Sequence, residues 1–61
     1  MTYVALLYSP SMDRFEIDCM TCFSYRHEDL AEWVGKIANY YNSKNEVYDF
    51  YIVSITKIGD N

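Results

Sequence analysis

The segment from Val47 to Ile58 constrains the fold more than any other, because it is rich in β-branched and aromatic residues on both of its alternating faces. One face would carry Tyr48, Phe50, Ile52 and Ile58, and the other Val47, Tyr51, Val53 and Ile55. A strand that is apolar on both sides usually lies in the centre of a sheet or is covered twice. One helix of about 18 residues is only about 27 Å long and can cover one side. We therefore expect either a neighbouring molecule or side chains of the first strand, such as Tyr3 and Tyr8, to cover the other side.

Two strands are predicted before this segment. Thr2–Ser9 is mostly apolar or β-favouring, and the residues Ser9-Pro10-Ser11-Met12-Asp13 supply the chemistry of a turn. The segment Arg14–Thr21 alternates, as a strand with one buried face does. We expect its apolar face to be buried; this face consists of Phe15, Ile17 and Cys19. We expect its other face to be exposed; it consists of Arg14, Glu16, Asp18 and Met20. The two strands should form a hairpin.

An amphipathic helix is predicted between the hairpin and the last strand. Ser24 is a suitable N-cap, and Asn42-Ser43-Lys44-Asn45 is expected to form the exit loop. Apolar residues recur at helical spacing in between, namely Leu30, Ala31, Trp33, Val34, Ile37, Ala38 and Tyr41. The order β-β-α-β predicts an α+β fold with a single domain over residues 1–61. It should contain a small three-stranded antiparallel sheet with one helix packed on one face.

The charge of the chain restricts its partners. Nine acidic residues against five basic residues give a net charge of −4 and an isoelectric point near 4.6. Such a chain is repelled by phosphate backbones and anionic membrane surfaces, so we expect no direct nucleic-acid binding and no membrane association. The longest apolar runs, such as Val4–Tyr8, are too short to span a bilayer, and the N-terminus does not have the pattern of a signal peptide. We therefore expect a cytoplasmic protein.

No set of residues indicates catalysis. Cys19 and Cys22 form a C-x-x-C motif, but a thioredoxin-like site requires a longer β-α-β framework and a structural zinc site requires four ligands. The single histidine, His27, falls at the start of the helix, where it is more often a solvent-facing side chain than a base. Gly35 and Gly59 are the only glycines, so no phosphate-binding loop is present. We predict no enzymatic activity, cofactor or metal; a redox pair and a metal shared by a dimer are the alternatives.

The aromatic content indicates a binding protein. Seven tyrosines, three phenylalanines and one tryptophan exceed what a chain of this size can bury, and tyrosine is favoured at protein interfaces. The expected anchors of the interface are Tyr3, Tyr48, Phe50 and Tyr51. Glu28, Asp29 and Glu32 fall in one turn of the helix, where they either present negative charge to a basic groove or complement the helix dipole.

Two short motifs suggest the kind of partner. Phe15-Glu16-Ile17 in the second strand is followed by Leu30-Ala31-Glu32-Trp33 in the helix. Over roughly residues 3 to 58, this resembles the small inhibitor of host RNA polymerase made by short-tailed coliphages, a β-β-α-β family with a similar Phe-Glu-Val and Leu-Ala-Glu-Trp. That family uses basic residues of its third strand for binding, whereas this chain has only Lys57 there. The resemblance therefore implies the general type, a phage protein that occupies the surface of a host or defence enzyme.

The leading hypothesis is thus an inhibitor of a host or defence enzyme, RNA polymerase or a nuclease, that acts by protein–protein binding and steric occlusion. Imitation of DNA charge against a restriction or CRISPR nuclease is an alternative, and it predicts an affinity that falls steeply with salt. Another alternative is a self-associating structural or regulatory module. In that homodimer the bare sheet face or the edge of the third strand would pair with a second copy.

Overall fold

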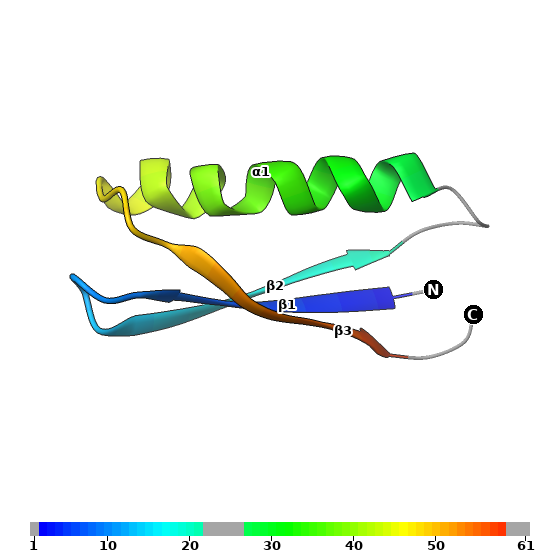
Figure 1. Cartoon of the computed structure of the whole chain (residues 1–61), viewed down its shortest axis with the longest axis horizontal. Helices are drawn as coiled ribbons and strands as arrows, with labels where there is room; N and C mark the ends of the chain where they lie inside the picture. Colours follow the sequence, from blue (N-terminus) through cyan, green and yellow to red (C-terminus); the bar gives the residue numbers. More distant parts are fainter. Residues whose placement is uncertain (1, 22–26, 59–61) are drawn as a thin grey trace.

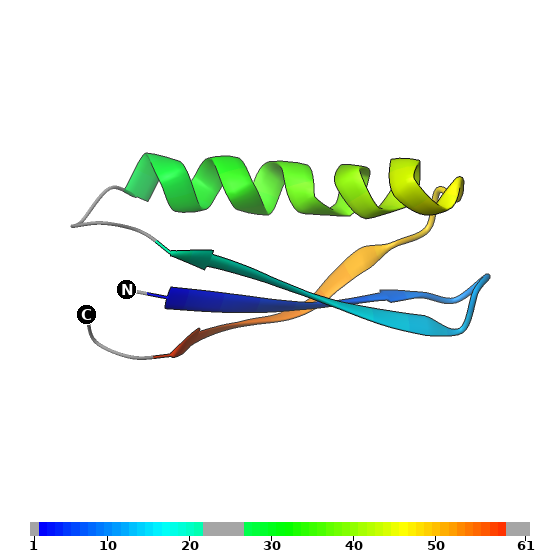
Figure 2. The same cartoon turned by 180° about the vertical axis from the view of Figure 1, so that it is seen from behind.

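The chain forms one helix and a three-stranded sheet, which confirms the predicted α+β fold and its β-β-α-β order. The structure is a computed structural model that describes residues 2–21 and 27–58, of which residues 27–29 by their backbone alone. Its elements are β1 (Thr2–Ser9), β2 (Arg14–Thr21), α1 (His27–Asn45) and β3 (Tyr51–Ile58). The expected N-cap, Ser24, lies outside the described residues. Figure 1 shows α1 running along one side of a twisted sheet, and Figure 2 shows the same arrangement from behind.

The central strand of the sheet is β1, and β3 lies at an edge. The strand order is β2-β1-β3, and both pairings are antiparallel. The last strand is therefore not central, and of the two expectations only its coverage on both faces stays a prediction. Because β2 and β3 are both antiparallel to β1, they run in the same direction, and α1 is the crossover between them. The β1–β3 register shifts between Leu6 and Leu7, as at a β-bulge.

The helix continues through the four residues 42–45 that were expected to form its exit loop. It ends because Glu46 adopts a left-handed conformation, with a φ of 57°. The Glu46 N–H donates to the Ser43 carbonyl at 3.4 Å, and the Val47 N–H donates to the Asn42 carbonyl at 3.0 Å. These are the two hydrogen bonds of a Schellman motif. The left-handed position of this motif is usually glycine. Because this chain has a glutamate there, the sequence does not indicate where the helix ends.

The core lies between α1 and one face of the sheet. Its buried residues are Ala5, Leu7, Ile37, Tyr41 and Phe50, and Met12, Trp33, Ala38, Val47 and Ile52 pack against them. Ala5 and Leu7 come from the central strand, whose alternate side chains face α1. The last strand begins at Tyr51 rather than at the predicted Val47. Residues 47–50 therefore form a connection, and Phe50 in that connection is 4% exposed.

Asp49 ties this connection to the hairpin turn between β1 and β2. Its Oδ1 accepts hydrogen bonds from the hydroxyls of Ser9 at 2.5 Å and Ser11 at 3.0 Å. Its Oδ2 accepts a further bond from the Ser11 N–H at 2.7 Å. These hydrogen bonds, the one from Ser9 above all, hold the pKa of Asp49 below its ordinary value. Two segments that are 38 residues apart in the chain are thereby joined.

Candidate functional site

The second strand turns toward α1 the face that the sequence analysis expected to be exposed. Phe15 and Ile17 are 59% and 64% exposed, and Cys19 is exposed as well. The polar residues Glu16 and Asp18 are half-buried, and Asp18 bonds to the helix. The expected burial of the apolar face is therefore wrong, because the helix packs on the opposite face of the strand.

The uncovered side of the sheet, which we call the outer face, is formed by alternate residues of all three strands. In the register of the sheet, Leu6 is opposite Ile17 of β2 and Ser54 of β3, so residues from each strand lie side by side. The members are Thr2, Val4, Leu6 and Tyr8 of β1, Phe15, Ile17, Cys19 and Thr21 of β2, and Tyr51, Ser54, Thr56 and Ile58 of β3. None of these described residues is an aspartate, glutamate, lysine, arginine or histidine. A chain with 23% charged residues thus has one sheet face without a charged side chain.

A row of three aromatic rings crosses the outer face near the hairpin turn. Tyr8 in the central strand pairs with Phe15 on one side and with Tyr51 on the other. The ring centroids lie 4.6 Å apart for Tyr8 and Phe15, and 6.2 Å apart for Tyr8 and Tyr51. The Tyr8 hydroxyl donates to Asp13 Oδ1 at 2.6 Å, and this bond raises the pKa of Tyr8 above its ordinary value. The row is thus fixed at its centre, while its two outer rings remain more than half exposed.

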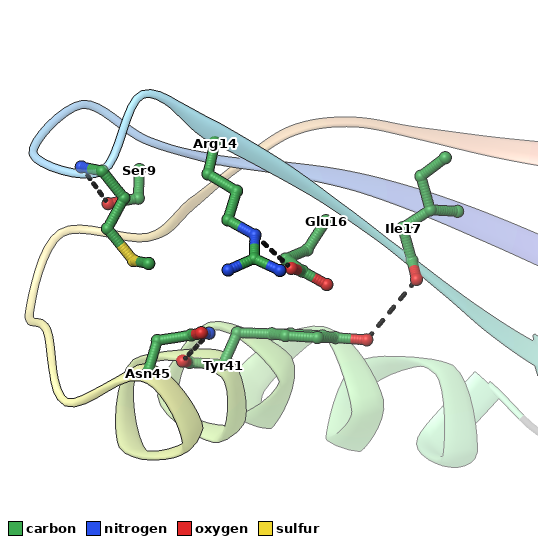
Figure 3. A network of polar contacts seen from close by, with 7 residues as sticks. Ser9, Arg14, Glu16, Ile17, Tyr41 and Asn45 are labelled. Atoms are coloured by element: carbon green, nitrogen blue, oxygen red, sulfur yellow. Dashed lines mark hydrogen bonds and ion pairs between the residues drawn. The ribbon is translucent and has the colours of Figure 1, made fainter.

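Hydrogen bonds on the covered side hold α1 to β2. Asp18 accepts one from the Trp33 indole N–H at 2.7 Å and one from the Tyr41 hydroxyl at 3.2 Å. The same hydroxyl lies 3.4 Å from the Ile17 carbonyl oxygen, and Figure 3 shows the Tyr41 side chain extending from α1 to β2. Burial, followed by the nearby charge of Asp18, raises the pKa of Tyr41 to about 12. The Asp18 side chain therefore helps to hold α1 against β2.

Most of the described acidic side chains are engaged within the fold. Asp13, Asp18 and Asp49 accept the hydrogen bonds given above. Glu16 pairs with Arg14 at 3.2 Å, as Figure 3 also shows. These four carboxylates lie under the helix and around the hairpin turn. The imitation of DNA charge stays a prediction.

The predicted acidic patch is described in part. Glu32 is exposed on α1 and pairs with Lys36 one turn later at 2.8 Å, which lowers the pKa of Glu32 below its ordinary value. The side chains of Glu28 and Asp29 lie outside the described residues. Their proposed contact with a basic groove therefore stays a prediction.

The four predicted aromatic anchors do not lie together. Tyr51 is on the outer face, and Tyr48 is 98% exposed in the connection between α1 and β3. Tyr3 is half-buried on the covered side of the sheet, since it shares that face with the buried Ala5. Phe50 is part of the core and is not available to a partner in the folded chain, contrary to the prediction.

Phe15 and Ile17 were not predicted as surface residues, whereas Tyr8 was expected to be able to cover the free side of the sheet and lies on the outer face. Their alternation identified two faces of β2 but not which of them meets the helix. The signal that separates the faces is the hydrogen bond between Asp18 and Trp33, which joins residues 15 positions apart and has no local sequence pattern.

The cysteine motif is also described in part. Cys19 is a free, exposed thiol on the outer face, which corrects the expectation that it is buried. Cys22 and the side chain of His27 lie outside the described residues. Among the side chains that the structure does describe, no three from histidine, cysteine, aspartate or glutamate are grouped so that they could hold a metal ion. In the described part of the chain, no helix combines the length and the apolar character needed to cross a membrane.

Comparisons with known proteins assign no family to this fold. The chain matches no protein-family model, no curated protein and no solved structure. The function is therefore inferred from the surfaces of the molecule themselves.

Proposed function

We propose that the chain is a binding protein that docks its outer face on another protein. The observation that supports this most is the exposure of Phe15, Ile17 and Tyr51 on a face without charged side chains. Ile58 extends the apolar surface along β3, with 48% of its area exposed. Contiguous apolar patches on soluble domains mark interaction sites, because water contact with such a patch is unfavourable.

Burial of these side chains would supply the binding free energy. Covering a large apolar side chain that is half exposed contributes about 1 kcal/mol. The aromatic row is also ordered before binding, because Tyr8 is held by Asp13 and contacts Phe15 and Tyr51. Association then loses less side-chain entropy than it would with free rings.

The narrower form of the proposal is inhibition. We propose that the chain covers a functional surface of a bacterial host or defence enzyme, RNA polymerase or a nuclease, in the host cytoplasm. Steric occlusion of this kind needs a docking surface and no catalytic residues. The resemblance to the coliphage inhibitor supports it, and Phe15 and Ile17 of the first shared motif lie on the outer face.

A pair of variants tests the docking surface. Ile17→Asp places a carboxylate on the outer face, whereas Tyr48→Ser removes a ring that is 98% exposed and lies elsewhere. We expect the wild type and Tyr48→Ser to capture the same protein from a bacterial lysate, and Ile17→Asp to capture none. Circular dichroism should show that all three chains are folded. Capture that persists with Ile17→Asp, or is lost with Tyr48→Ser, contradicts the proposal.

Two further measurements decide the kind of partner. Sedimentation equilibrium at micromolar concentration should give a monomer; a dimer that Ile17→Asp dissociates would show that a second copy covers the outer face. Added to transcription by bacterial RNA polymerase or to DNA cleavage by a nuclease, the wild type should inhibit one reaction and Ile17→Asp neither. Inhibition that disappears at moderate salt would indicate charge imitation instead.

A further inference from the structure

A groove between α1 and the edge strand β2 combines a carboxylate with aromatic rings. It has a volume of about 280 Å³ and is lined by Asp18, Trp33, Lys36, Ile37, Tyr40 and Tyr41. We call it the Asp18 groove. Because Asp18 points toward the helix, the groove is separate from the outer face.

Asp18 brings an acidic group into this groove without a basic partner among the described residues. Its two hydrogen bonds come from neutral donors, the indole of Trp33 and the hydroxyl of Tyr41. The ion pairs Arg14–Glu16 and Lys36–Glu32 do not include Asp18. A cation adds a direct attraction between opposite charges, which the indole and the hydroxyl do not supply. A cation that enters the groove would therefore gain an interaction that the fold leaves unused.

The tyrosine rings form a corner beside this carboxylate. The centroids of Tyr40 and Tyr41 lie 5.0 Å apart, and their planes meet at 89°. The ammonium group of Lys44 lies 5.8 Å from the Tyr41 centroid, so this ring already attracts a cation in the folded chain. Lys36 at the rim is held by Glu32 at 2.8 Å, and its charge is compensated there rather than in the groove.

We propose that the Asp18 groove binds the guanidinium or ammonium head of a basic side chain presented by the partner protein. The carboxylate supplies the opposite charge, and the rings supply cation–π attraction. The volume suits one such head group, since sites for drug-sized ligands are usually larger. The claim that a partner protein supplies the cation rests on the proposed function. The claim that the groove binds a free cation does not.

Titration with N-acetyl-argininamide tests the groove directly. Trp33 is the single tryptophan of the chain and its indole bonds to Asp18, so its fluorescence and its indole N–H resonance both report on the groove. At constant ionic strength we expect a saturable change with a Kd on the order of 10 mM. N-acetyl-citrullinamide, which has nearly the same shape without the charge, should produce none. Equal binding of the two probes, or no saturable change with either, overturns the inference.

Substitutions locate the binding. Asp18→Asn should weaken binding of N-acetyl-argininamide about fivefold, and Tyr40→Leu, which removes an exposed ring, about two- to fivefold. If Asp18→Asn binds N-acetyl-argininamide as tightly as the wild type does, the inference is overturned. If Asp18→Asn does not fold, wild-type affinity in Tyr40→Leu overturns it instead. Ile17→Asp should leave this affinity unchanged, so a failure of the outer face does not count against the groove. Saturating N-acetyl-argininamide should also reduce capture of the partner, and unchanged capture would exclude the partner as the source of the cation.

Discussion

The edge strand β2 divides its residues between the two faces of the sheet in the opposite way from most strands of a sheet that has one solvated side. On the covered face β2 contributes Glu16 and Asp18, and on the outer face it contributes Phe15 and Ile17. Ordinarily the apolar residues of such a strand meet the core and the polar residues meet water. Here the helix is attached through a small apolar core and the hydrogen bonds of Asp18, and the large apolar side chains of β2 are left exposed.

If the outer face binds a partner as proposed, the stability of the fold and its binding depend on different faces. Substitutions on the covered face should lower the free energy of unfolding. Substitutions on the outer face should lower binding while the free energy of unfolding changes little. Variants matched across the two faces can therefore separate the two properties.

Leu7→Ala should have the largest effect. Leu7 is fully buried in the core, and its truncation is expected to cost about 2–5 kcal/mol, which is most of the stability of so small a domain. The matched control Ile17→Ala removes a side chain of similar size where it is 64% exposed, and it should cost less than about 1 kcal/mol. Urea unfolding followed by circular dichroism measures both. Equal losses would show that both faces stabilise the fold.

Asp49→Asn tests the polar link at the hairpin end of the covered face. Hydrogen bonds lower the pKa of Asp49, so its ionised form stabilises the fold. That contribution is complete above the ordinary pKa of aspartate, about 4, and is lost as the pH falls through the lowered pKa. We expect the variant to have a lower Tm at neutral pH, and to lose less Tm than the wild type on acidification from about pH 5 to pH 2.

The exposed pair of Glu32 and Lys36 provides a control for this acid experiment. Glu32→Gln also removes a carboxylate whose pKa is lowered, but its partner lies on the surface of α1 and is screened by water. The Tm of Glu32→Gln should stay close to that of the wild type at neutral pH. A larger loss of Tm in Glu32→Gln than in Asp49→Asn would contradict the importance of the link between the hairpin and the connection.

Tyr41→Phe keeps the buried ring and removes the hydroxyl that bonds to Asp18. We expect a loss of about 1–2 kcal/mol, whereas Tyr40→Phe on the exposed neighbouring ring should change stability by less than about 0.5 kcal/mol. Because the pKa of Tyr41 is raised to about 12, its neutral form stabilises the fold. This contribution is complete below about pH 10 and is lost as the pH rises through the folded pKa. Alkaline unfolding of the wild type and of Tyr41→Phe measures it, and identical curves would argue against it.

Glu46→Gly should give the smallest effect and one of opposite sign. Glu46 holds a φ of 57° at the end of α1, a conformation that glycine adopts without strain. The variant should gain about 0.5–1 kcal/mol in thermal or urea unfolding. Glu46→Ala removes the same charge and keeps the strain, so it should not gain stability. A gain in stability in both variants would show that the loss of charge causes the effect. Binding through the outer face should be unchanged in both variants.

The bounds of the first two strands were predictable from the sequence, and the faces of the sheet were not. The turn residues from Pro10 to Asp13 end β1 and begin β2 at the positions that the sequence indicated. The resulting register makes Leu7 share a face with Glu16, and Tyr8 with Phe15. Which of these two faces meets the helix depends on contacts between distant parts of the chain, so periodicity alone could not decide it. The proposed docking surface was predicted as an uncovered sheet face, but of its three aromatic residues only Tyr51 was among the predicted anchors.

β1 precedes the other elements in the chain, and yet both of the other strands pair with it. Its pairing with β3 joins Thr2 to Ile58, so this half of the sheet cannot form before nearly all of the described chain has been synthesised. Until then a nascent hairpin has two unpaired edges and apolar side chains such as Leu7 and Ile17 on its two faces, which makes it prone to aggregate. Slow translation of the segment between β2 and β3 would lengthen this exposed interval.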